Sequence, residues 1–170
     1  MKEIDTFVTH LECSYTGKTY PADQLHGLSE AGKPLLVRYD LEALGKAVEK
    51  EDLEGRLPEF WRYREFLPVR KSENIVRLGE LMTPILPAEK LQNEYGCGEI
   101  LIKDESRLPT GSFKARGLAL AVAMAKELGV TRMAMPTNGN AGAALAAYCS
   151  AADIETYIFC PEDTPQVNIA

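Results

Sequence analysis

The spacing of hydrophobic residues changes several times along the second half of the chain. Short apolar runs at 99–103, 132–135 and 154–159 predict strands. Between them, apolar residues that recur every three or four positions predict helices over about 112–128 and 140–152. The first of these helices would turn a single apolar face towards the core, made of Leu118, Ala121, Val122, Ala125 and Leu128.

The order of these elements predicts the fold class. Strands that alternate with helices indicate an α/β fold with βαβ units, a parallel sheet and right-handed crossovers. Ligands of such sheets bind beyond the carboxyl ends of the strands. We therefore expect the loops that follow the strands at 99–103 and 132–135 to meet in a common crevice.

The first eighty residues are organised differently. A strand is predicted over 35–39, and a helix follows over 41–48 with Asp40 as its N-cap. We divide the chain into an N-terminal module over 1–80 and a βαβ segment over 81–170.

Charge and hydropathy argue against two classes of function. The formal charge of −6 is opposite to that of a general nucleic-acid binder. No run approaches the roughly 18 consecutive apolar residues of a membrane span. The first residues, Met1 to Thr6, lack the apolar core of a signal peptide, which favours a cytoplasmic protein.

The cysteines suggest neither disulfides nor metal. They are scattered through the chain with no CxxC pair, and only two histidines accompany them. Tetrahedral zinc needs four ligands, often from two close cysteine pairs, so we expect no bound metal. The four positions are Cys13, Cys97, Cys149 and Cys160.

Candidate chemistry begins at Lys114, in the run Leu-Pro-Thr-Gly-Ser-Phe-Lys-Ala-Arg-Gly over 108–117. A lysine amine can form a Schiff base with an aldehyde cofactor such as pyridoxal phosphate. A place in the first helical turn and partial burial would both favour the neutral, nucleophilic amine. The alternative is an exposed lysine on an ordinary amphipathic helix, which is the commonest fate of a lysine.

A second motif, Thr-Asn-Gly-Asn-Ala-Gly over 137–142, opens an alanine-rich helix. Asparagine and glycine permit left-handed backbone conformations, and free amides at a helix start can hold a carboxylate or a phosphate. The alternative is a capped loop before a tightly packed helix. Neither a dinucleotide-binding GxGxxG nor a phosphate-binding GxxxxGK[ST] motif is present.

Together these two motifs resemble the Schiff-base segment and the asparagine loop of the fold-type II pyridoxal-phosphate enzymes. Further segments resemble the threonine synthases, and the likeness runs from about residue 11 to residue 165. The segments are Leu-Leu-Val-Arg-Tyr-Asp-Leu from 35, Phe-Trp-Arg-Tyr-Arg-Glu-Phe-Leu-Pro from 60, and Glu-Asn-Ile-Val-Arg-Leu-Gly-Glu from 73.

The resemblance implies a pyridoxal-phosphate-dependent lyase that acts on a phosphorylated amino acid. Lys114 would form the Schiff base, and Asn140 would donate to the phenolic oxygen of the cofactor. Ser112 and Phe113 would complete the cofactor-binding set. The substrate carboxylate would be held by four residues of the second motif, Thr137, Asn138, Gly139 and Ala141. The family is also compatible with a homodimer.

Two departures from the family pattern lead to further expectations. Many relatives begin with a zinc ribbon, whereas here Cys13 remains and Thr16 replaces the second cysteine. We expect a degenerate module without metal, packed around Leu11, Tyr15, Tyr20, Leu25 and Leu36. The family's later glycine-rich loop for the cofactor phosphate is missing, and a helix would only be starting at 166–170. The fold is therefore expected to be incomplete and the 170-residue chain inactive alone.

Alternatives remain open. Threonine or serine dehydratases and cysteate synthase share the Ser-x-Lys motif and the asparagine loop. A non-catalytic fragment that needs a complementary chain is a further alternative.

Overall fold

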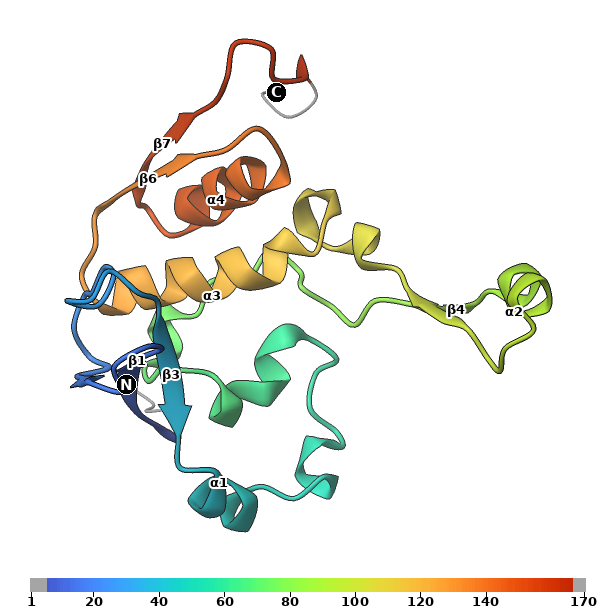
Figure 1. Cartoon of the computed structure of the whole chain (residues 1–170), viewed down its shortest axis with the longest axis horizontal. Coiled ribbons are helices and arrows are strands. Elements are labelled where there is room, and N and C mark those ends of the chain that lie inside the picture. The colour runs from blue at the N-terminus through green and yellow to red at the C-terminus, as the bar shows by residue number, and fades with distance from the viewer. Residues whose placement is uncertain (1–5, 167–170) are drawn as a thin grey trace.

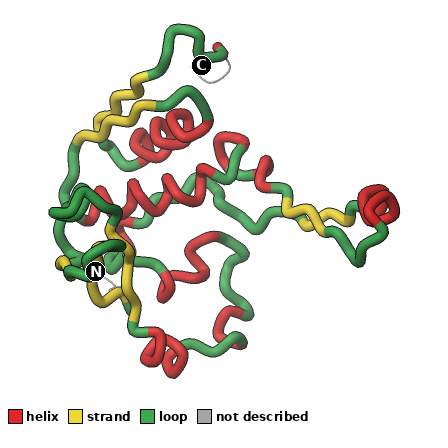
Figure 2. The backbone as a smooth tube through the Cα atoms, viewed as in Figure 1, coloured by secondary structure: helices red, strands yellow, loops and turns green. Residues whose placement is uncertain are grey.

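The computed structural model describes residues 6–166 (Figures 1 and 2). Its first layer is a small antiparallel sheet of β1 (Val8–Cys13), β2 (Thr19–Tyr20) and β3 (Leu35–Tyr39), in the order β2-β1-β3. The strand predicted at 35–39 is confirmed. The helix that was expected to start at 166–170 lies almost entirely outside the described residues.

The packing expected for this N-terminal module is wrong at three of its five residues, whereas Leu11 and Tyr20 are partly buried. Tyr15 and Leu25 are 77% and 72% exposed, and Leu36 is also exposed. The buried centre is instead Cys13, whose thiol donates to Ser29 Oγ at 3.1 Å. The buried part of this sheet thus contains a hydrogen bond between two short side chains, together with the buried Val8 of β1.

We expect this module to be independent of zinc. The side chains of Cys13 and Ser29 already bond each other, and residues 6–166 contain no group of three or more His, Cys, Asp or Glu placed to hold a metal ion. Purified protein should contain much less than one zinc per chain by elemental analysis, and chelation should leave the melting temperature unchanged. A stoichiometric zinc with Cys13 among its ligands would contradict this.

A helical segment links this module to the rest of the chain. Helix α1 (Leu41–Ala47) begins as expected, because the Asp40 side chain accepts from the Ala43 N–H. Three short 3-10 helices follow, η1 (Glu51–Leu53), η2 (Phe60–Phe66) and η3 (Ser72–Asn74). From η2, Trp61 is buried and donates its indole N–H to the Val76 carbonyl.

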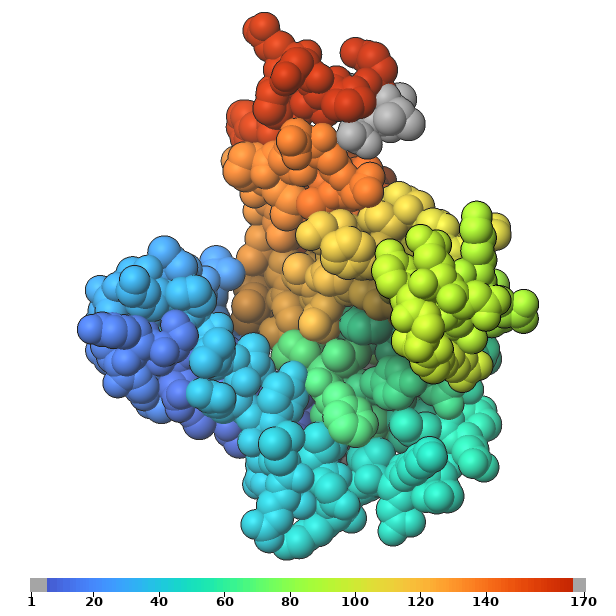
Figure 3. Space-filling view, turned by 45° about the vertical axis from the view of Figure 1, so that its right-hand side comes forward, coloured from blue at the N-terminus to red at the C-terminus, as the bar shows by residue number. Residues whose placement is uncertain are grey.

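An arm leaves the body of the molecule next (Figures 1 and 3). It consists of β4 (Ile85–Pro87), α2 (Glu89–Tyr95) and β5 (Leu101–Lys103), with β4 and β5 paired antiparallel. The expectation that the strand at 99–103 joins the parallel sheet is therefore wrong. Its pairing partner is the extended segment that precedes it, a local contact that an apolar run alone does not distinguish from a parallel one.

The predicted βαβ unit is present in the last third. Strand β6 (Arg132–Pro136) runs parallel to β7 (Glu155–Phe159), and α4 (Asn140–Ala151) connects them. Helix α3 (Lys114–Glu127) packs along α4 (Figure 1). Among the described residues no helix is long and apolar enough to cross a membrane.

The core lies between α3, α4 and the segment that contains Trp61. The α3 face differs from the expected one at Ala121, which is exposed, because the helix is contacted from two sides and buries neighbouring alanines instead. Gly129, with φ +72°, lies just past the end of α3 as expected. The buried α3 residues are Ala115, Leu118, Ala119, Val122, Ala123 and Ala125.

Candidate functional site

The segment before Lys114 is a tight, strained turn. It contains η4 (Glu105–Arg107) and η5 (Pro109–Gly111). Thr110 has φ +60° and ψ 17°, in the left-handed region that a β-branched side chain rarely adopts. Gly111 follows with φ +68°. Such strain persists only where the surroundings over-determine the backbone, and it concentrates at functional sites.

Lys114 is the first residue of α3. Its main-chain N–H donates to Oγ of buried Ser112 at 3.3 Å, and its Nζ lies 4.8 Å from the ring centroid of Phe113. Lys114 is exposed, which agrees with the alternative that the sequence left open and not with partial burial. The predicted position of Lys114 in the first turn of the helix agrees with the structure. At that position the amine lies on the molecular surface.

The second motif is fixed by the neighbouring strand. The Thr137 N–H donates to the Phe159 carbonyl at 2.9 Å, which extends the β6–β7 ladder. The Gly139 N–H then donates to Thr137 Oγ1 at 3.2 Å. Helix α4 starts at Asn140, so the main-chain N–H groups of Asn140 and Ala141 belong to its first turn and precede the intrahelical hydrogen bonds.

Gly142 allows α4 to begin this close to the strands. A Cβ at this position would lie 2.5 Å from Thr137 Cγ2 and 3.0 Å from Ile158 Cγ2. Both are methyl carbons bonded directly to a branched Cβ, so they cannot move away without a change of the whole side chain or of the backbone. The absence of a side chain at Gly142 thus allows the start of α4 to lie close to the loop at 137–139.

The two motifs do come together, although not along a shared sheet edge. Turn η5 lies against α4, and the starts of α3 and α4 are on the same side of the molecule (Figure 1). The exposed amine of Lys114 and the helix start at Asn140 therefore belong to one region. An amine beside a helix start can hold a carbonyl group and an anion together.

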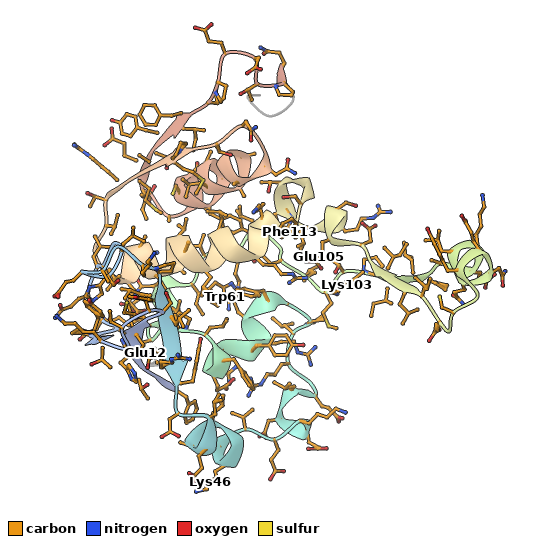
Figure 4. All side chains as sticks on the ribbon, viewed as in Figure 1. Glu12, Lys46, Trp61, Lys103, Glu105 and Phe113 are labelled. Carbon is orange, nitrogen blue, oxygen red and sulfur yellow. The ribbon has the colours of Figure 1, made fainter. Side chains whose placement is uncertain are left out.

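A half-buried ion pair adjoins this region. Arg116 donates from Nε to Glu105 Oε2 at 2.6 Å and from Nη2 to Glu105 Oε1 at 3.0 Å, and Thr83 also donates to Oε1. The Arg116 hydrogen bond lowers the pKa of Glu105 to about 2. Figure 4 places Glu105 between Lys103 and Phe113, where the arm meets the body.

The low pKa of Glu105 predicts an acid-sensitive contribution to stability. Because the pKa is lower in the folded than in the unfolded chain, the stabilisation is complete above about pH 4.5 and is lost as pH falls towards 2. Glu105→Gln should cost about 1–3 kcal/mol at pH 7. Urea unfolding at several pH values should show this difference shrinking below pH 4.5. A difference that is independent of pH would contradict the assignment.

A second polar contact is fully buried beneath the site. The hydroxyl of Tyr148, on α4, donates to Glu80 Oε1, which also accepts from the Leu78 N–H at 2.8 Å. Burial, and then the hydrogen bond to Glu80, raise the pKa of Tyr148. Sequence reasoning did not identify Glu80, Glu105 or Arg116. Glu80 ends the quoted segment that starts at residue 73, Arg116 lies inside the run 108–117, and Glu105 lies just before that run, but nothing in the spacing marks them as partners.

Comparison with known proteins places these features in a family. Residues 76–170, more than half of the chain, match the family described as pyridoxal-phosphate dependent enzyme. The chain belongs to this family. Both motifs and the Glu105–Arg116 pair lie within the matched residues.

Similar proteins extend the likeness to the first half of the chain. It is 39% identical over 150 residues to a threonine synthase of Methanocaldococcus jannaschii, which covers 88% of this chain and 37% of that protein. A threonine synthase of Methanosarcina acetivorans is 33% identical over 89% of this chain and 37% of its own length. One from Halalkalibacterium halodurans is 43% identical over 59% of this chain and 28% of its own. The matched part of the chain thus spans 28% to 37% of the length of these three relatives.

The residues present fit part of what pyridoxal phosphate requires. Lys114 offers an exposed amine for the aldehyde, and α4, against which η5 lies, offers main-chain N–H donors at its start. The individual roles expected for Ser112, Phe113, Asn140 and the 137–141 residues stay predictions, as does the division of the chain at residue 80.

Proposed function

We propose that this chain supplies the lysine and the carboxylate-binding loop of a threonine synthase, which converts O-phosphohomoserine and water into threonine and phosphate. The observation that carries the proposal is the adjacency of η5, which leads to exposed Lys114, and α4, which starts at Asn140. The likeness to three threonine synthases supports the choice of reaction.

Each residue then has a physical task. The N–H groups at the start of α4, with Thr137 and Asn138, bind the substrate carboxylate and orient Cα towards Lys114. Asn140 would donate to the phenolic oxygen of the cofactor. The Lys114 amine takes a proton from substrate carbon and returns one later in the reaction. Pyridoxal phosphate, when bound, supplies the electron sink for the carbanions that arise.

The chain is proposed to work only together with further polypeptide. Both faces of the β4–β5 ribbon carry exposed apolar residues, and an isolated two-stranded ribbon is barely stable in water. The outer face of β6–β7 is also open, with Tyr157 and Phe159 exposed, whereas parallel sheets are normally covered on both faces. The exposed ribbon residues are Ile85, Leu86, Leu101 and Ile102.

Complementation tests this function. The chain would be joined to the part of the Methanocaldococcus jannaschii enzyme that follows the matched residues. We expect phosphate and threonine from O-phosphohomoserine with the joined protein and no turnover with the 170-residue chain alone. A joined protein that is folded and loaded with cofactor, yet only deaminates threonine or serine, would favour a dehydratase. One that forms cysteate would favour cysteate synthase.

Assembly and location are further parts of the proposal. The reaction belongs to amino-acid biosynthesis, so we place the enzyme in the cytoplasm. A homodimer stays a prediction, which light scattering of the joined protein would test.

A further inference from the structure

The loop that leads to Lys114 is closed at both ends by one ion pair. Glu105 lies at the start of the loop, and Arg116 lies in the first turn of α3, two residues after the lysine. Two parallel hydrogen bonds of 2.6 and 3.0 Å join them in the fork geometry that only a guanidinium gives. Their side chains are 24% and 26% exposed, so water screens this pair only partly.

The strained backbone lies inside the closed loop. Thr110, with φ +60°, and Gly111, with φ +68°, are both between Glu105 and Arg116. Left-handed conformation at a β-branched residue costs energy and needs support from its surroundings. The neighbouring pair of Asp104 and Arg107 cannot give that support, because it spans only three residues and Arg107 is 71% exposed.

We propose that Glu105 and Arg116 are positioning residues, whose paired hydrogen bonds hold the Thr110–Gly111 turn and thereby aim the Lys114 amine towards the start of α4. The Thr83 hydroxyl also donates to Glu105, so this ion pair is connected to the segment at the base of the arm. This inference rests on the proposed function, because the direction of the Lys114 amine matters only if that amine reacts with the cofactor.

The test measures where pyridoxal phosphate attaches, and it needs no turnover. The chain is incubated with pyridoxal phosphate, reduced with borohydride and digested, and the modified lysines are quantified by mass spectrometry. Lys126, also exposed and on the same helix, is the internal reference. Glu105→Gln and Arg116→Lys should each lower the Lys114 to Lys126 ratio by about tenfold, since small misplacements of a reacting group have large effects on rate.

Two controls separate positioning from folding. Glu155→Gln breaks another arginine–carboxylate pair, Arg132–Glu155 at 2.7 Å, which is far more exposed, and should leave the ratio unchanged. The exchange Glu105→Arg with Arg116→Glu should restore part of the ratio. Hydrogen exchange should rise at the amides of 109–112 in Glu105→Gln while the amides in the middle of α3 stay protected.

The outcomes distinguish this inference from the function on which it rests. If Lys114 of the unaltered chain is modified no more than Lys126, the positioning fails, whereas the proposed function, which needs further polypeptide, is decided by turnover of the joined protein. If Lys114 is preferred in the unaltered chain and equally preferred in Glu105→Gln and Arg116→Lys, the positioning alone is overturned.

Discussion

Lys114→Ala should abolish both the reducible attachment of pyridoxal phosphate and turnover in the joined protein. The free energy of unfolding should change by no more than about 0.5 kcal/mol, because the side chain is exposed at a helix start. Lys114→Arg should fail equally, since a guanidinium does not form the Schiff base. Absorbance of the bound cofactor, borohydride reduction and phosphate release measure these effects.

The matched control for Lys114 is Lys126, the other lysine of α3. Its Nζ donates to the Glu73 carbonyl at 3.0 Å, so Lys126→Ala removes a surface contact and nothing near the site. That variant should keep attachment and turnover. Reducible attachment that survives in Lys114→Ala would place the cofactor on a different lysine.

Gly142→Ala should destabilise the chain by about 1–3 kcal/mol. The added methyl group would lie 2.5 Å from Thr137 Cγ2 and would push the start of α4 away from the 137–139 loop. Since Asn140 and Ala141 are in the same turn, the joined protein should also lose affinity for its substrate. Urea unfolding of the chain and the KM of the joined protein would measure the two effects.

Two further variants test the cause of the Gly142 effect. Gly117→Ala adds the same methyl group to α3, where nothing lies within 4 Å, and should stabilise the helix by about 0.5–1 kcal/mol. Thr137→Ser removes Cγ2 and keeps the hydroxyl that accepts from Gly139. Combined with Gly142→Ala it should recover most of the lost stability. A full loss in the double variant would show that the clash with Thr137 is not the cause.

The elements of the fold were largely predictable because they are local. The strand at 35–39, the Asp40 cap and the βαβ unit of β6, α4 and β7 follow from spacing and capping chemistry within a few residues. Pairing was less predictable. The apolar run that contains β5 has the composition of a buried parallel strand, yet it pairs antiparallel with β4.

The two motifs of the candidate site were predictable from the sequence. The side-chain contacts that hold them in place were not. Lys114 and Asn140 stand at the helix starts where their motifs predicted them. The Glu80–Tyr148 contact joins residues 68 positions apart, and spacing within one helix or strand carries no information about such pairs. The sequence left the exposure of Lys114 open between partial burial and the surface, because burial depends on segments far away in the sequence.

The most direct measurement is a map of reduced pyridoxyl groups on the joined protein. We expect one modified peptide from this chain, carrying the group on Lys114, in an amount close to one per protein. We also expect that O-phosphohomoserine, added before the borohydride, removes most of that modification. Modification at Lys103 or another lysine, or an even spread that follows exposure alone, would contradict the account.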